Sequence, residues 1–215
     1  MQMTQNKDLK RRAIVYIDGF NLYFGIRDKN WYNLMWLDQV KLARELVRPD
    51  QELLCVKYFT SRIKNDPEKQ QRQNAYLDAL DTLRPFLEIY YGEYRDESFI
   101  CRQCGKNHRQ SHEKQTDVNI ATHMLVDAFS DRVDDIILIT ADSDQCPAMN
   151  AVREAKKHVL IVLPPGRGDY LEVQFAADNK LELTAKKLRA SLLPSELRRA
   201  DGFLIECPRK YRSVS

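Results

Sequence analysis

The chain has 215 residues, of which 43% are hydrophobic and 30% are charged, and its formal net charge is +3. These values are ordinary for a soluble globular protein and exclude a strongly basic nucleic-acid coat protein, although a local basic patch stays compatible with them. No apolar run approaches the roughly 20 residues that a membrane span needs, and the N-terminus lacks the apolar core of a signal peptide. Five cysteines without a secretion signal predict a cytoplasmic protein with reduced thiols and no membrane association.

Short apolar runs rich in β-branched residues alternate with longer segments of helical spacing. The runs predict strands at 13–18, 55–60, 87–94, 135–140 and 158–164. The longer segments predict helices at 37–47, 67–83, 116–131 and 146–157. Near-continuous hydrophobicity is typical of parallel strands that are covered on both faces. The alternation therefore predicts an α/β fold with a mainly parallel sheet and right-handed crossovers.

Two regions interrupt this alternation. Residues 95–115 are polar and carry no strand or helix pattern of useful length, which predicts an insertion or a long loop. Residues 195–215 form a mixed C-terminal tail with five basic residues, Arg198, Arg199, Arg209, Lys210 and Arg212.

Acidic residues follow two of the predicted strands. Asp18 follows the first, Asp142 and Asp144 follow the fourth, and Asp117 begins the helix before the fourth. Ligands of open parallel sheets bind at the carboxyl ends of the strands. Four carboxylates in one cleft would repel strongly unless a cation joined them, and ligation by oxygen alone suits Mg²⁺ or Mn²⁺.

Each of these acids also has a structural explanation. Asp144 could be the N-cap of the helix that carries Pro147 in its first turn. Asp117, or Thr116 before it, could cap the preceding helix, and Asp18 lies in the turn-forming sequence DGFN. Capping does not require an acid directly after each of two strands, so the four together favour a site.

Polar side chains beside the acids have two interpretations. Asn21 and Ser143 could hydrogen-bond a phosphate or a metal-bound water, or they could be ordinary loop residues. The segment LPPGRGDY at 163–170 could contact phosphate, or it could be a simple loop before the next helix.

Three segments resemble the acidic motifs of the NYN domain, in the same order and spacing: YIDGFNLY at 16–23, KQTDVNIATHML at 114–125 and ILITADSDQCPAM at 136–148. They look like the LabA-like (DUF88) branch, whose fold is similar to that of PIN-domain nucleases. The resemblance covers about residues 12–165, and LELTAKKLRASLLP at 181–194 resembles the C-terminal end of that branch. It implies one domain over 12–194, with an insertion at 95–115, and a three-layer α/β/α, PIN-like (Rossmann-like) fold.

The resemblance also implies a function, namely RNA cleavage by metal-assisted hydrolysis of phosphodiester bonds. Asp18, Asp117, Asp142 and Asp144 would be the catalytic metal ligands for Mg²⁺ or Mn²⁺, supported by Asn21 and Ser143. The ion would polarise the phosphoryl oxygen and help ionise an attacking water, and one carboxylate could act as the base. The sequence departs from the family at His123, where many members have Asp, and at Gln145, where many have Phe.

The polar segment 95–115 contains a compact set of metal-ligand residues. Cys101, Cys104, His108 and His112 are spaced C-x₂-C-x₃-H-x₃-H, which suits tetrahedral Zn²⁺. A structural zinc ion would stabilise a polar loop that has no hydrophobic core of its own. The alternative is a flexible loop with free thiols and solvated histidines.

Basic and aromatic side chains could bind RNA beside the acids. Arg62 and Lys64 follow the second predicted strand, and Lys114 ends the polar segment; all three could hold phosphates, or form an ordinary solvated surface. Four aromatic residues could stack on unpaired bases or belong to the core: Tyr23, Phe24, Trp31 and Tyr32.

The sequence thus favours a metal-dependent ribonuclease with RNA as its partner, and it leaves a homodimer open. The alternative is a non-catalytic RNA-binding or regulatory module that keeps the acidic cleft. A phosphatase of the haloacid-dehalogenase type is disfavoured because Phe20 stands where that family needs a second Asp. A dinucleotide-binding enzyme is disfavoured because no G-x-G-x-x-G follows the first strand.

Overall fold

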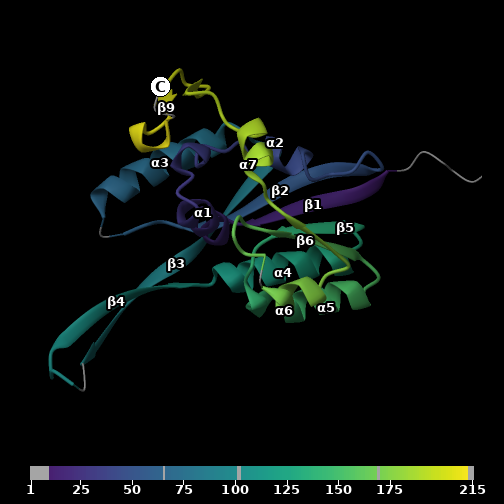
Figure 1. Cartoon of the computed structure of the whole chain (residues 1–215), viewed down its shortest axis with the longest axis horizontal. Helices are drawn as coiled ribbons and strands as arrows, with labels where there is room; N and C mark the ends of the chain where they lie inside the picture. The colour runs from purple at the N-terminus through teal and green to yellow at the C-terminus, as the bar shows by residue number, and fades with distance from the viewer. Residues whose placement is uncertain (1–9, 65, 101–102, 169, 213–215) are drawn as a thin grey trace, which may run out of the picture.

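The computed structural model describes residues 10–64, 66–100, 103–168 and 170–212, without the side chains of 94–99 and 108–114. Its main sheet has seven strands in the order β4-β3-β2-β1-β5-β6-β7 (Figure 1). These are β1 (Arg11–Asp18), β2 (Gln51–Ser61), β3 (Leu87–Ile100), β4 (Asn107–Lys114), β5 (Asp135–Ile139), β6 (His158–Leu163) and β7 (Asn179–Glu182). All neighbours pair in parallel except β3 and β4. The predicted α/β fold with a mainly parallel sheet is confirmed.

Helices cover both faces of the sheet. One face carries α1 (Gly19–Asp28), α2 (Gln39–Arg44), α3 (Pro67–Asp81) and α7 (Ala185–Ala190), and the other carries α4 (Thr116–Phe129), α5 (Cys146–Glu154) and α6 (Leu171–Phe175). Alternate residues of β1 enter the two cores: Val15 and Ile17 pack with the first set, and Ile14 and Tyr16 with the second. The three-layer arrangement is therefore as predicted. Among the described residues, the helices are all too short or too polar to cross a membrane.

The polar segment 95–115 is not the loop that its sequence suggested. β3 continues to Ile100 and pairs antiparallel with β4, from Glu93 opposite Lys114 to Ile100 opposite Asn107. In Figure 1 this hairpin extends away from the layered body. The sequence of this segment is polar and has no apolar alternation, so the usual strand signal is missing.

The C-terminal tail is also structured and packs on the domain. Strands β8 (Glu196–Arg198) and β9 (Leu204–Glu206) form a small antiparallel sheet, followed by the 3₁₀ helix η3 (Arg209–Tyr211). Two buried tail residues, Ile205 and Cys207, pack in a third apolar cluster with Trp36, Ala79 and Leu193. Figure 1 shows this segment beside α3.

Candidate metal centre

Three of the predicted acids converge at the carboxyl edge of the sheet. Asp18 ends β1, Asp117 lies in the first turn of α4, and Asp142 follows β5. One carboxylate oxygen from each lies within 4.8 Å of the others. They come together because β1 and β5 are adjacent parallel strands, whose carboxyl ends meet at one edge.

Asp18 is the most firmly held of the three. It is 3% exposed and is the N-cap of α1, where its Oδ1 accepts a hydrogen bond from the Asn21 backbone N–H at 3.0 Å. Its Oδ2 accepts from Asn21 Nδ2 at 2.7 Å and from Thr140 Oγ1 at 3.0 Å. Asn21 in turn accepts from the Ala141 backbone N–H at 3.3 Å. The DGFN sequence thus begins a helix, and Asn21 links the ends of β1 and β5.

Asp142 is fixed by a second hydrogen bond to the same threonine. Its backbone N–H donates to Thr140 Oγ1 at 3.1 Å, and its Oδ1 accepts from the Asp144 backbone N–H at 3.0 Å. Asp142 is therefore the N-cap of the 3₁₀ helix η2 (Ser143–Gln145). Asp144 does not cap α5 as expected, since that helix begins after Gln145 without a side-chain cap. Thr140, fully buried, positions two acids, and the sequence analysis missed it.

Asp117 is the acid of the cluster whose pKa is raised. Neither it nor Thr116 caps α4, whose N-cap position is Gln115 with a φ of 80°. Burial raises the pKa of Asp117 to about 6, and the negative charges of Asp142, Asp18 and Asp144 add to the rise. The buried Gln145 donates from Nε2 to the Asp117 carbonyl at 3.2 Å. Gln145, a departure from the family pattern, thus helps to hold the start of α4.

Two further predicted site residues, Asp144 and Ser143, lie outside the group of three converging acids. Asp144 is exposed, and its charge acts on Asp117 from outside the group of three. Ser143 is half-buried within η2.

The donor set fits a hard divalent cation. Three carboxylates whose oxygens converge offer only oxygen ligands, the type that Mg²⁺ and Mn²⁺ prefer. Without a cation these like charges destabilise one another, and after burial they are the further cause of the raised pKa of Asp117.

A pocket of about 290 Å³ opens beside the acids, and the segment 163–170 lines part of it. Arg167 and Tyr170, from the segment 163–170, border this pocket together with Phe24. Arg167 donates to Asp28 at 2.7 Å. The segment that could contact phosphate therefore does lie next to the acids.

Among the described residues, Arg62 and Lys64 do not line the pocket beside the acids. Arg62 donates to Asn74 Oδ1 at 3.0 Å and to the Tyr91 hydroxyl at 3.3 Å, so its guanidinium lies along α3 and β3. Lys64 is exposed after β2, and the side chain of Lys114 lies outside the described residues.

His123 faces the sheet rather than the acids. Its ring lies 4.0 Å from that of Tyr90, and its Nδ1 is 3.4 Å from Lys57 Nζ, which pairs with the buried Asp127. Burial and then the Lys57 charge lower the pKa of His123. His123 is therefore a half-buried residue of α4.

The predicted zinc site stays a prediction. Cys104 is exposed, Cys101 lies outside the described residues, and so do the side chains of His108 and His112. Both histidines belong to β4, where a regular strand separates residues four positions apart by about 13 Å. His112 is therefore the hardest of the four to bring onto one ion.

Comparisons with known proteins bear on the family. The NYN domain matches residues 12–183. The chain is 25% identical over 221 residues to 6-hydroxy-3-succinoylpyridine 3-monooxygenase HspA of Pseudomonas putida, a match that spans 85% of this chain and 70% of that protein. A solved structure of a protein of unknown function from Vibrio parahaemolyticus is similar in fold, with a TM-score of 0.56 and 20% identity, over 88% of this chain and 100% of that one. Because the NYN match spans most of the sequence, this chain belongs to the NYN domain family.

Proposed function

We propose that this protein is a metal-dependent endoribonuclease of the LabA-like (DUF88) branch that hydrolyses RNA phosphodiester bonds with Mg²⁺ or Mn²⁺. The observation that carries the proposal is the convergence of Asp18, Asp117 and Asp142 from three separate elements to within 4.8 Å. The membership of the NYN family supports it. A cytoplasmic location and a homodimer stay predictions.

Each acid has a place in the proposed reaction. Asp18, Asp117 and Asp142 would hold the ion, and Asn21 and Thr140 keep Asp18 oriented through their hydrogen bonds. When bound, a hard divalent cation would supply electrophilic stabilisation of the phosphoryl oxygens. Asp144 is exposed beside the cluster and, because it is outside the three converging acids, would be the carboxylate that accepts a proton from an attacking water.

The test is cleavage of labelled RNA with Mn²⁺ by the wild type and by the Asp142→Asn, Asp144→Asn double variant. Loss of several kcal/mol of transition-state stabilisation would slow cleavage by about a hundredfold or more. Asp134→Asn, at the opposite edge of the sheet, is the matched control and should cleave normally. Equal cleavage by the wild type and the double variant would contradict the proposal. RNA binding with no metal-dependent cleavage would favour the non-catalytic RNA-binding or regulatory module instead.

The similarity to a curated monooxygenase favours a second candidate function. That relative is named for oxidation of 6-hydroxy-3-succinoylpyridine, and its match spans 85% of this chain. The candidate is tested by supplying this protein with that compound, O₂ and NADH as the electron donor, and by following loss of the compound by chromatography. An unchanged substrate peak would remove this candidate.

A further inference from the structure

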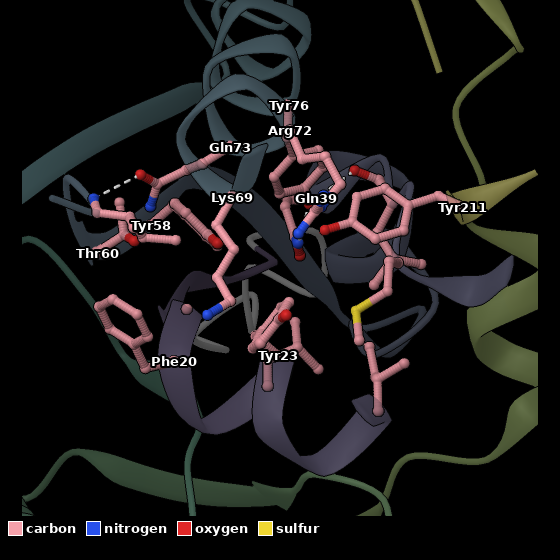
Figure 2. A pocket seen from close by; sticks show the side chains of 16 residues that line it. Phe20, Tyr23, Gln39, Tyr58, Thr60, Lys69, Arg72, Gln73, Tyr76 and Tyr211 are labelled. Carbon is pink, nitrogen blue, oxygen red and sulfur yellow. Dashed lines mark hydrogen bonds between the residues drawn. The ribbon is translucent and has the colours of Figure 1, made fainter. Parts of the chain in front are cut away.

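A second pocket, with five aromatic residues in its lining, lies between α1 and α3. We call it the aromatic pocket, after its aromatic lining residues Phe20, Tyr23, Tyr58, Tyr76 and Tyr211 (Figure 2). It is partly open and has a volume of about 80 Å³. Phe20 also borders the pocket beside the acids, so the two pockets share a wall.

The aromatic pocket contains a buried acceptor that lacks a donor. Gln39 is 1% exposed, and its Nε2 donates to the Tyr76 hydroxyl at 2.6 Å, which donates to the Leu37 carbonyl at 3.0 Å. This chain of donors fixes Oε1 of Gln39 as an acceptor. Among the described residues Oε1 has no hydrogen-bond partner. Such buried groups are costly without a partner. Because Oε1 is itself closed off from solvent, an N–H donor of a ligand would reach it after a small shift of the pocket wall.

Positive charge lies on the α3 side of the same pocket. Arg72 has a side chain that is 20% exposed, makes a long contact of 3.5 Å with Glu68 and is also hydrogen-bonded to Tyr211. Lys69 pairs with Asp66 at 2.7 Å, and in Figure 2 its amino group extends between Phe20 and Tyr23. An anionic substituent on the ligand would be attracted here.

The size of the pocket limits the ligand to a small ring. A closed cavity of about 150 Å³ holds benzene. The aromatic pocket, at about 80 Å³, is smaller, so a single ring would enter it only in part, with its substituents at the open mouth, and a fused two-ring system would enter still less.

We propose that the aromatic pocket binds the pyrimidine base of a nucleotide next to the cleaved bond of the RNA substrate. The base would stack on the tyrosine rings and donate an N–H to Gln39 Oε1, and its phosphate would face Arg72 and Lys69. This proposal rests on the proposed ribonuclease function, because it assigns the neighbouring nucleotide of that substrate. It also gives the tail a role, since Tyr211 from η3 forms one wall.

The proposal is tested by calorimetric binding of cytidine and uridine 5′-monophosphate in EDTA, where no cleavage occurs. Both should bind at least tenfold more tightly than adenosine 5′-monophosphate, which has a two-ring base, and than ribose 5-phosphate, which has none. Gln39→Leu keeps the volume and removes the acceptor, so it should weaken pyrimidine binding by about tenfold. Gln71→Leu, at an exposed position of α3 outside the pocket, is the matched control and should bind normally. Tyr211→Ala removes one wall near the chain end and provides a second variant, should Gln39→Leu fail to fold.

Three results would overturn the inference: equal binding of ribose 5-phosphate, unchanged pyrimidine binding in the pocket variants, or tenfold tighter binding of 6-hydroxy-3-succinoylpyridine than of either pyrimidine nucleotide. Failure of the ribonuclease function gives a different result. A protein that binds pyrimidine nucleotides through Gln39 but never cleaves RNA would contradict only the nuclease. A protein that cleaves RNA with the same base preference in the wild type and in Gln39→Leu would contradict only the aromatic pocket.

Discussion

Aspartates lie at both ends of the adjacent strands β1 and β5. Their charged neighbours are arginines at the amino end and other aspartates at the carboxyl end. At the amino end, Arg11 donates to Asp135 at 2.7 and 2.9 Å, and Arg12 donates to Asp134 at 2.8 Å. At the carboxyl end, the charges that act on Asp117 are those of other aspartates. The fold therefore supplies cations for its acids at one edge and gathers further acids at the other.

The pKa values record this difference. The hydrogen bond from Arg12 lowers the pKa of Asp134 to about 2. Burial, followed by the charges of Asp142, Asp18 and Asp144, raises the pKa of Asp117 to about 6. Ion pairs at the amino edge thus serve stability, whereas the carboxyl edge opposes stability until a cation binds. Natural proteins accept such destabilisation at functional sites.

The largest change in stability should come from removing the ion pair between Arg11 and Asp135 at the amino end of the two strands. Arg11→Met leaves the carboxylate of Asp135, which is 1% exposed, without its bidentate partner. Breaking a fully buried pair costs roughly 3–5 kcal/mol. Because the Arg11 side chain is 47% exposed and His158 Nδ1 lies 3.3 Å from Asp135, we expect a loss of about 2 kcal/mol.

Urea unfolding at pH 7 measures this loss. Arg48→Met, which removes an exposed contact of 3.3 Å to Asp50, is the control and should change the free energy of unfolding by less than about 0.5 kcal/mol. Equal losses in the two variants would mean that burial of Asp135 does not set the cost.

The next largest effect should have the opposite sign. Asp117→Asn removes one charge from the repelling cluster, so the metal-free variant should be more stable than the wild type at pH 7. The pKa shift is discounted because Asp117 is exposed to water, which leaves an expected gain of about 1 kcal/mol. Thermal melting in EDTA measures it. Adding Mn²⁺ should stabilise the wild type more than the variant, and a variant less stable than the wild type in EDTA would contradict the repulsion.

The pH range of this gain follows from the raised pKa. Between its unfolded value of 3.8 and its folded value of about 6, Asp117 holds a proton more tightly in the folded state than in the unfolded state. The wild type therefore loses stability as the pH rises through this range. The advantage of Asp117→Asn should be absent below about pH 4 and complete above about pH 6.

Hydrophobic periodicity was sufficient to predict most of the layered body, because buried strands and helices differ in period. It missed α1, since DGFN fits a turn as well as a capped helix start, and the structure uses Asp18 as the cap. It missed β4 because the sequence of that strand, NHRQSHEK, is polar throughout and has no apolar alternation. The tail strands of three residues each are too short for a periodic signal.

The only site residues whose proximity could be predicted are those that directly follow adjacent strands of the sheet. Asp18 and Asp142 follow adjacent strands, so their proximity follows from the fold. The roles of Thr140 and Gln145 depend on hydrogen bonds across 122 and 28 residues of sequence, and no local pattern encodes them. The unpaired acceptor of Gln39 is likewise a tertiary feature, since it depends on the hydroxyl of Tyr76.

The smallest effect should come from Asp134→Asn, and its pH dependence should differ from that of Asp117→Asn. The pKa of Asp134 falls from 3.8 to about 2 in the folded protein, so its stabilisation is present above about pH 4 and is lost as the pH falls toward 2. The variant should melt slightly below the wild type at pH 7, and this deficit should disappear between about pH 4 and pH 2.

Melting curves of both Asp→Asn variants from pH 2 to pH 7 would test the two edges together. The Asp117→Asn curve should lie above the wild type and rejoin it between about pH 6 and pH 4, whereas the Asp134→Asn curve should lie below and rejoin it at lower pH. The two residues belong to opposite ends of the same layered body, so their effects should be nearly additive in the double variant. Deviations of the same sign in both variants would show that the two edges do not differ as their charges indicate.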